Sequence, residues 1–296
     1  MKWMALADSC ICCGGQDLWS APAVLMPFVA DRALGQKPVE ISADWGLRDL
    51  RAGTAHTLCH SLQCPSCGVL FLDYRFTPGQ MSSLYHDYRG ADYTRQRDEY
   101  EPGYAATVAL DYRERHPYIA QVEQWLLTHF SDLPRQPRIL DWGGGDGSNT
   151  PFLGHALVHV HDIAGTTLVA GAEPANVSTK ATDAGGYDLL VCMQVLEHVA
   201  DPLTVLQELL PFMQEKTLLY LEVPYEKLLS QHPDGINLTS YKRHWHEHVN
   251  FFTRQSLLEL TRRAGLRMVD GLLLCVENGY RQGQVQGLLL AKEPRS

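Results

Sequence analysis

The stretch Ile139-Leu140-Asp141-Trp142-Gly143-Gly144-Gly145-Asp146-Gly147 decides the fold of this chain. Apolar residues lead into an acidic residue, and glycines follow at positions 143, 145 and 147. Glycine has no Cβ, so a loop of this kind lets the backbone approach a ligand closely. A buried strand that ends in such a loop predicts an open α/β sheet, in which nucleotide-like ligands bind beyond the carboxyl ends of the strands.

Strand and helix patterns alternate around this loop. Helices are expected over 118–127, after the pair Asp201-Pro202, which is typical of a helix start, and over 254–264. The expected strands are 138–142, 157–162, 187–193, 217–223, 266–276 and 284–291. This alternation predicts a Rossmann-like α/β fold, with a mainly parallel sheet and helices on both faces.

The composition is that of an ordinary globular protein, with 45% hydrophobic and 20% charged residues in a chain of 296. The net charge is −9, and no dense run of Lys or Arg is present, so a nucleic-acid partner is not expected. We find neither a signal-peptide pattern nor an apolar run of about 20 residues, the length that spans a membrane. A cytoplasmic protein without a membrane partner is expected.

Six of the eight cysteines lie in the first 67 residues. Cys10-Ile11-Cys12-Cys13-Gly14 and Cys64-Pro65-Ser66-Cys67-Gly68 both follow the pattern C-x-x-C-G. In a reducing compartment, clustered cysteines indicate a metal site rather than disulfides. Each motif resembles a zinc knuckle, and two knuckles supply the four thiolates of a closed structural zinc site.

The predicted zinc ligands are Cys10, Cys13, Cys64 and Cys67. Cys12, Cys59 and His60 are competing ligands, because residues 14–63 separate the two motifs and must fold back. A catalytic zinc ion is not expected, since four cysteine ligands leave no open coordination position. The sequence therefore predicts a small zinc-binding domain in front of the α/β domain.

The glycine-rich stretch reads D-x-G-x-G-x-G and resembles motif I of the S-adenosylmethionine (SAM) dependent methyltransferases with a Rossmann-like fold. Asp162 lies 21 residues after Asp141, at the end of the next expected strand, where an acidic residue can accept hydrogen bonds from ribose hydroxyls. NAD-binding proteins share this ribose contact. Asp141 could interact with the amino group of the ligand, and Gly143, Gly145 and Gly147 would form the loop around its methionine portion.

Residues 187–202, which read YDLLVCMQVLEHVADP, resemble the fourth strand and following turn of these methyltransferases. By this resemblance Gln194 lies where the chain leaves the sheet, beside the methionine portion of SAM and the acceptor. For Glu197 and His198 we expect a structural role, in which the side chains hold the turn through hydrogen bonds to the backbone.

The resemblance extends over most of the chain, to sugar C-methyltransferases that carry an N-terminal zinc-binding domain. Leu84-Tyr85-His86-Asp87-Tyr88 resembles their L-Y-x-D-Y motif, and residues 246–253 with 257–265 resemble their C-terminal portion. We therefore expect a zinc-binding domain at 1–75, a helical connector or lid at 76–135 and a SAM-dependent methyltransferase domain at 136–296.

The turn His244-Trp245-His246-Glu247-His248 is the other chemical cluster. On an extended segment its three histidines would share one face and could bind a metal, and a polar loop without chemistry is the plainer alternative. Glu247-His248 matches the E-H pair that has acid/base roles in the sugar C-methyltransferases. By that resemblance His248 is the general base and Glu247 supports it, a task that suits the near-neutral pKa of histidine.

The sequence thus predicts a SAM-dependent methyltransferase with structural zinc, acting on a small-molecule acceptor such as a sugar, a nucleotide sugar or another biosynthetic intermediate. The alternative is a zinc-containing interaction protein on a methyltransferase-like scaffold that no longer turns over. SAM binding would distinguish the two.

Overall fold

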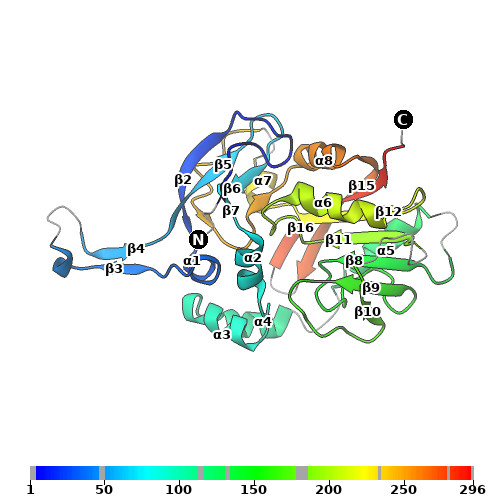
Figure 1. Cartoon of the computed structure of the whole chain (residues 1–296), viewed down its shortest axis with the longest axis horizontal. Coiled ribbons are helices and arrows are strands. Elements are labelled where there is room, and N and C mark those ends of the chain that lie inside the picture. Colours follow the sequence, from blue (N-terminus) through cyan, green and yellow to red (C-terminus); the bar gives the residue numbers. More distant parts are fainter. Residues whose placement is uncertain are drawn as a thin grey trace.

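A seven-stranded sheet carries the glycine-rich loop in the computed structural model, which describes residues 5–46, 51–111, 116–130, 134–177, 186–232, 235–278 and 281–294 (Figure 1). The strand order is β10-β9-β8-β11-β12-β16-β15. Strands β8 to β12 run parallel, whereas β16 is antiparallel to β12 and to β15. The strands are β8 (Arg138–Trp142), β9 (Leu157–His161), β10 (Ala172–Pro174), β11 (Leu189–Met193), β12 (Leu218–Pro224), β15 (Leu266–Asn278) and β16 (Arg281–Lys292).

Helices cover both faces of this sheet, as the alternating pattern predicts. On one face α5 (Ile119–Leu127) packs against Leu189 and Val191 of β11. On the other face α6 (Pro202–Leu209) and α8 (Arg254–Arg263) pack against Leu190 and Cys192 of the same strand. Successive side chains of a strand point to opposite faces, which is why one strand contributes to both layers of the core. The predicted Rossmann-like α/β fold is confirmed.

The caps of α6 and α8 explain where these helices begin. The carboxylate of Asp201 accepts hydrogen bonds from the backbone N–H groups of Leu203 and Thr204, both at 3.1 Å. Thr253 and Ser256 form a reciprocal capping box at the start of α8. Such caps satisfy backbone donors that have no partner within the helix. The expected helix start at Asp201-Pro202 is therefore confirmed.

A second, five-stranded sheet has the order β13-β2-β5-β6-β14. It combines β2 (Trp19–Leu25), β5 (Leu58–Gln63) and β6 (Leu70–Leu72) with two short strands from far along the chain, β13 (His244–Trp245) and β14 (Asn250–Phe251). β13 pairs with β2, and β14 pairs with β6. The expected boundaries at residues 75 and 135 stay a prediction, but residues 244–251 clearly complete the N-terminal sheet.

Smaller elements surround the second sheet. The hairpin of β3 and β4 projects from the left of the molecule in Figure 1, and α3 and α4 lie lower in the same view. α1 and α3 share a core with the second sheet, in which Phe28, Tyr93 and Trp245 are fully buried. The remaining elements are β1 (Ala5–Leu6), α1 (Pro27–Leu34), β3 (Val39–Ile41), η1 (Ala43–Trp45), β4 (Gly53–Ala55), β7 (Tyr74–Arg75), α2 (Pro78–Tyr85), α3 (Ala91–Tyr100), α4 (Tyr104–Asp111), η2 (Leu210–Phe212) and α7 (Lys227–Ser230).

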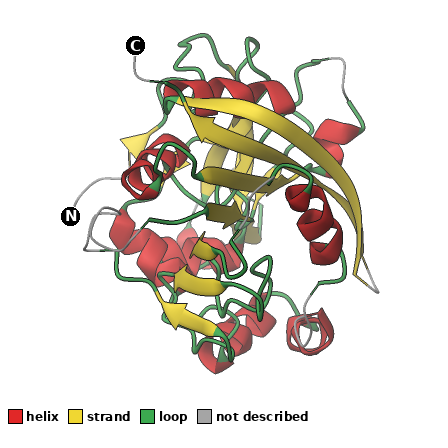
Figure 2. Ribbon diagram, turned by 90° about the vertical axis from the view of Figure 1, so that its right-hand side faces the viewer, coloured by secondary structure: helices red, strands yellow, loops and turns green. Residues whose placement is uncertain are grey.

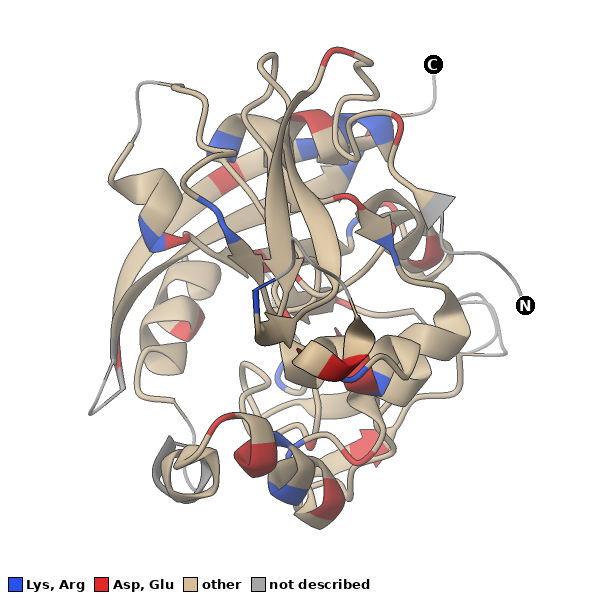
Figure 3. Cartoon of the chain, turned by 90° about the vertical axis from the view of Figure 1, so that its left-hand side faces the viewer, with Lys and Arg blue, Asp and Glu red and all other residues tan. Residues whose placement is uncertain are grey.

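The ribbon of β15 and β16 curves along the edge of the larger sheet (Figure 2). Viewed from the opposite side, acidic and basic residues are interspersed along the helices in the lower part of the molecule (Figure 3). Within the described part of the chain, none of the helices is long and apolar enough to cross a membrane.

Candidate functional site

The glycine-rich loop leaves β8 with three residues in the left-handed region of backbone conformation. Gly143, Gly145 and Gly147 have φ angles of 79°, 61° and 83°. A Cβ at Gly143 would lie 2.4 Å from Cγ2 of Val195, whereas a Cβ at Gly145 would meet no heavy atom of the described residues within 4 Å. Packing therefore requires glycine at position 143, while the backbone at position 145 faces open space that a ligand can occupy.

Asp162 follows β9 and contacts this loop directly. The N–H of Gly145 donates to Oδ2 of Asp162 at 2.8 Å, and the N–H of Ala164 donates to Oδ1 at 2.7 Å. An ionised carboxylate has about four lone-pair sites, so two bonds leave capacity for further donors such as hydroxyls. Asp162 thus lies beside Gly145, on the side where the backbone is open. The predicted contact between Asp162 and a ribose would be made on this side.

Asp141 lies beneath the loop. Its side chain is buried and accepts a hydrogen bond from Oγ1 of Thr150 at 2.5 Å. A Cβ at Gly144 would lie 2.5 Å from the Asp141 carboxyl carbon, so the loop covers the carboxyl group closely. Burial raises the pKa of Asp141 to about 7, and the charge of Asp162 adds to the rise. The carboxyl group is positioned to support the loop from below.

Gln194 follows β11 with a φ angle of 56°, a conformation that is unusual for a residue other than glycine. Its Nε2 donates to Oε1 of Glu222 at 3.0 Å. The hydroxyls of Tyr118 and Tyr220 also donate to Glu222, at 2.8 and 2.6 Å. Burial raises the pKa of Glu222. This buried carboxyl group fixes Gln194 where the chain leaves the sheet.

The carboxylate that contacts His248 is Glu226. Nδ1 of His248 lies 2.6 Å from Oε1 of Glu226, which follows β12. Burial acts to lower the pKa of His248, but the bond to Glu226 and the charges of nearby carboxylates raise this pKa overall. In the described part of the chain the other ring nitrogen, Nε2, makes no hydrogen bond.

Glu247 faces away from His248 and toward α3. Its Oε2 lies 2.6 Å from Nη1 of Arg97, while Oε1 is buried without a hydrogen-bond partner among the described residues. Burial raises the pKa of Glu247 to about 7. The side chains of His246 and Glu101 are in direct contact, and His244 is exposed on β13. The three histidines of this turn therefore have different surroundings and do not converge on one point.

In the turn after β11 the side chain of His198 contacts the backbone as expected, whereas that of Glu197 does not. The backbone carbonyl of Glu197 accepts bonds from the N–H groups of Val249 and Asn250, but neither carboxyl oxygen of Glu197 has a partner among the described residues. Burial raises the pKa of this carboxyl group to about 8. Nδ1 of His198 lies 3.1 Å from the carbonyl of Glu247 and 2.7 Å from the hydroxyl of Tyr85.

Sequence reasoning assigned no chemistry to Glu222 or Glu226 and only a structural role to Glu197. One signal could have drawn attention to them. All three lie at or just after the carboxyl ends of β11 and β12, the edge at which open α/β sheets bind their ligands.

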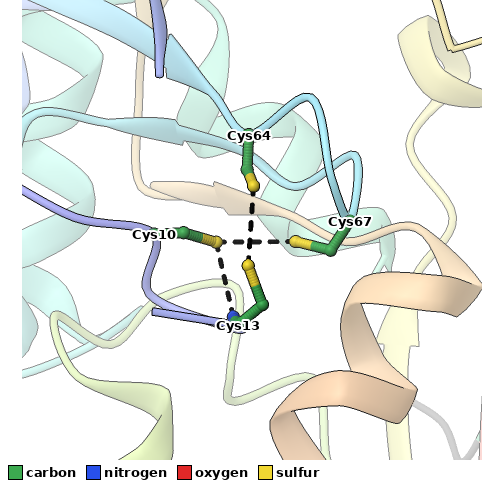
Figure 4. Close-up of side chains that lie close together, drawn as sticks. All are labelled: Cys10, Cys13, Cys64 and Cys67. Carbon is green, nitrogen blue, oxygen red and sulfur yellow. Dashed lines mark hydrogen bonds between the residues drawn. The ribbon is translucent and has the colours of Figure 1, made fainter. Parts of the chain in front are cut away.

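The four predicted zinc ligands come together (Figure 4). The sulfur atoms of Cys10, Cys13, Cys64 and Cys67 all lie within 4.8 Å of one another. Sγ of Cys10 is 3.5 Å from Sγ of Cys67, and Sγ of Cys13 is 3.6 Å from Sγ of Cys64. Four sulfurs at about 2.3 Å from a tetrahedral ion lie about 3.8 Å apart, so this geometry fits zinc.

The two knuckles have matching backbone turns. The N–H of Gly14 donates to the carbonyl of Cys10 at 2.9 Å, and the N–H of Gly68 donates to the carbonyl of Cys64 at 2.8 Å. Both glycines have positive φ angles, 79° and 81°. The N–H of Cys13 points to Sγ of Cys10 at 3.4 Å. Such turns hold the sulfur atoms of each pair on one side of the loop.

The competing ligands lie outside this group of four sulfurs. Cys59 belongs to the core around α1, and Nδ1 of His60 lies 3.0 Å from Oδ2 of Asp73. Cys12 is buried beside the cluster in the core that it shares with α8. The carbonyl of Cys12 accepts a bond from Nη1 of Arg263 at 2.6 Å. The cluster therefore joins the N-terminal segment to the larger sheet through α8.

Comparison with known proteins identifies one family. Residues 112–270, more than half of the chain, match the family model described as "Methyltransferase domain". No curated protein matches the chain.

Similar solved structures include a 1,6-didemethyltoxoflavin-N1-methyltransferase from Burkholderia thailandensis, at 19% identity over 67% of this chain and 87% of that one, with a TM-score of 0.44. A SAM-dependent methyltransferase from Methanosarcina mazei has 15% identity over 57% of this chain and 98% of that one, with a TM-score of 0.41. Magnesium protoporphyrin IX methyltransferase from Synechocystis PCC 6803 has 18% identity over 58% and 80%, with a TM-score of 0.39.

Proposed function

The chain belongs to the methyltransferase domain family, and from this premise we propose that it transfers a methyl group from SAM to a small-molecule acceptor. The observation that carries the proposal is the open glycine-rich loop after β8, with Asp162 at its side. This combination provides backbone groups that a ligand can approach and a carboxylate with spare acceptor capacity.

The residues of this edge would divide the binding of SAM among them. The loop at Gly143, Gly145 and Gly147 would hold the methionine portion, and Asp162 would accept hydrogen bonds from the ribose hydroxyls. Gln194, fixed on Glu222, would position the reacting end of the ligand. Asp141 supports the loop from below. When bound, SAM supplies an electrophilic methyl group, so placement of the acceptor accounts for much of the rate.

On the acceptor side we assign proton removal to Nε2 of His248, with Nδ1 held by Glu226. A histidine oriented by a carboxylate is a common form of general base. Glu247, paired with Arg97, would support the same wall of the site. The resemblance of the Glu247-His248 pair to sugar C-methyltransferases supports a sugar, a nucleotide sugar or a related biosynthetic intermediate as the acceptor.

We further propose that Cys10, Cys13, Cys64 and Cys67 hold a structural zinc ion. Sulfur spacing and two matched knuckle turns support this assignment. The zinc-binding unit would occupy residues 1–75, the connector 76–135 and the methyltransferase unit 136–296, with β13 and β14 reaching back into the first of these units.

Isothermal titration with SAM, without any acceptor, tests the proposal. We expect the parent protein to bind SAM and Asp162→Ala to bind it at least about tenfold more weakly, because a hydrogen bond to a charged group contributes about 1.5–3 kcal/mol. Asp188→Ala is the matched control, since Asp188 lies at the opposite end of β11 and bonds the backbone N–H of Arg138.

Binding of NAD without binding of SAM would overturn the cofactor assignment. Equal SAM affinity in Asp162→Ala and the parent would remove the ribose contact. A protein that binds neither ligand would favour the interaction-protein alternative.

A further inference from the structure

A second group of metal-ligating side chains lies at the carboxyl edge of β11. Glu197, His198 and His248 each offer one ligand atom, and these atoms all lie within 4.8 Å of one another. We propose that these three side chains bind one divalent transition-metal ion. The site is separate from the four cysteines and shares no ligand with them.

The unsatisfied side chain of Glu197 is the strongest indication of this site. Its side chain is fully buried, and neither Oε1 nor Oε2 has a hydrogen-bond partner among the described residues. A buried carboxyl group without a partner is costly, and native structures satisfy nearly all such polar atoms. Nε2 of His198 lies 3.7 Å from Oε1 of Glu197, and burial lowers the pKa of His198 well below its usual value, which favours the neutral imidazole that binds metals.

Both histidines are held in the way that metal-binding histidines usually are. A ligating imidazole generally donates its second ring N–H to a carboxylate or a backbone carbonyl, which orients the ring. Nδ1 of His248 lies 2.6 Å from Glu226, and Nδ1 of His198 lies 3.1 Å from the carbonyl of Glu247. This arrangement leaves Nε2 of each ring for the ion. The ring centroids of His198 and His248 are 4.7 Å apart, and the two rings are nearly perpendicular, at 87°.

The donor set indicates the class of ion. Two imidazoles and one carboxylate suit Zn²⁺ or Fe²⁺, whereas Mg²⁺ prefers oxygen ligands. Ligand atoms at about 2.1 Å from an ion lie about 3.0–3.4 Å apart, so the three side chains need only a small closing movement. A set of three ligands also leaves open positions, and the side chain of His248 is 41% exposed.

The open positions would receive an oxygen atom of the acceptor, an inference about role that rests on the proposed function. Gln194 is only three residues before Glu197 and marks where the acceptor would meet the methyl donor. A bound hydroxyl would lose its proton more readily on the ion. Nε2 of His248 cannot bind a metal and accept a proton at once. In the metal-loaded protein the ion would instead lower the pKa of the bound hydroxyl, and the proton would leave to water.

Metal content per chain tests the site. Protein purified without chelator is saturated with Zn²⁺ or Co²⁺, freed of unbound ions and subjected to elemental analysis. We expect about one more ion per chain in the parent than in Glu197→Gln or His248→Ala. His244→Ala is the matched control, because His244 belongs to the same turn but is exposed, and it should keep the content of the parent.

The variant Glu226→Gln adds a second readout, because loss of a carboxylate behind a ligating histidine typically weakens metal affinity about 10–100-fold. Circular dichroism and SAM titration of the same samples establish that each variant is folded.

Equal metal content in the parent, Glu197→Gln and His248→Ala would overturn the site and leave His248 as a base. If the parent binds SAM but shows no extra ion, the proposed function is still supported. A parent protein that holds the extra ion but does not bind SAM would reject the proposed function and still support the metal site.

Discussion

Buried carboxyl groups dominate the chemistry of this site at the scale of single residues. Asp141, Glu197, Glu222 and Glu247 all lie near the carboxyl edge of the parallel strands, and burial raises the pKa of each one. Their surroundings nevertheless differ. Glu222 has three hydrogen-bond donors and Glu247 has an arginine, whereas Glu197 has neither. Carboxyl groups that are all buried therefore differ in their partners. Glu197, which has none among the described residues, is the one best suited to bind a ligand.

Asp141→Asn should alter the pH dependence of stability. The pKa of Asp141 is about 7 in the folded protein against a usual value of 3.8, so the folded state binds the extra proton. Stability from this group is present below pH 3.8, falls as the pH rises and is lost above about 7. Asparagine cannot ionise, so the variant should be the more stable protein at pH 8, by up to about 4 kcal/mol.

Urea unfolding at pH 5.5 and pH 8.5 measures this effect, with Asp146→Asn as a control for loss of a charge in the same loop. We expect the difference in free energy of unfolding between the Asp141→Asn variant and the parent to grow at the higher pH. A difference that stays constant or shrinks would contradict the prediction.

The positions of site residues that follow a recognisable local sequence pattern could be predicted. The positions of site residues defined by contacts with distant parts of the chain could not. Asp162 and the glycines of the loop lie at the ends of strands with clear apolar patterns, so their place on the sheet edge follows from the sequence. Glu226 depends on His248, and Glu197 depends on the burial that residues 247–250 provide. No local pattern encodes these contacts, because the partners meet only after the chain has folded.

At the scale of elements, the loop after β8 combines two different requirements for glycine. Gly143→Ala should cost more stability than Gly145→Ala, because its new Cβ would meet Val195 at 2.4 Å while that of Gly145 meets no atom. Both substitutions carry the left-handed backbone cost of about 1–2 kcal/mol. We expect Gly145→Ala to weaken SAM binding by filling the space beside the loop.

Gly154→Ala is the matched control for this prediction, since Gly154 also has a positive φ, 88°, and open surroundings. Thermal unfolding and SAM titration of the three variants provide the comparison. Unchanged SAM affinity in Gly145→Ala, or the same loss of affinity in Gly154→Ala, would argue against a ligand at this loop.

Long elements with clear periodicity were predicted well, and short elements were not. The expected strand 138–142 matches β8, and the expected helix 254–264 matches α8 to within one residue. β10, β13 and β14 have two or three residues each, too few for a periodic pattern. β13 and β14 exist because β2 and β6 offer free edges, which is a property of the folded sheet rather than of the segments themselves.

At the scale of the whole molecule, the cysteine cluster links the two sheets. Oγ1 of Thr253 donates to the carbonyl of Cys67 at 2.7 Å, and Arg263 donates to the carbonyl of Cys12, so both ends of α8 contact the knuckles. β13 and β14 continue the link, because they flank residues 246–249 and anchor them to the N-terminal sheet. The segment that carries His248 is consequently tied to the N-terminal sheet, which also carries Cys64 and Cys67 in the turn between β5 and β6.

Removal of zinc should therefore affect the two sides of the active site differently. We expect about one zinc ion per chain at the four cysteines, and metal binding at such sites is coupled to folding. Chelation, or Cys64→Ser combined with Cys67→Ser, should increase hydrogen exchange in β2, β5 and residues 244–251. Exchange in β8 and β11 should stay slow, because these strands are central in the other sheet.

SAM affinity should then change little, while any activity that requires His248 should fall. Cys275→Ser is the matched control, since Cys275 is exposed on β15, away from the cluster. Three results would contradict this view: zinc absent from the purified protein, a zinc content of the double variant equal to that of the parent, or exchange in residues 244–251 that does not respond to zinc loss. The last result would mean that the segment carrying His248 is held by the larger sheet and the helices alone, because the N-terminal sheet would then contribute nothing to its order.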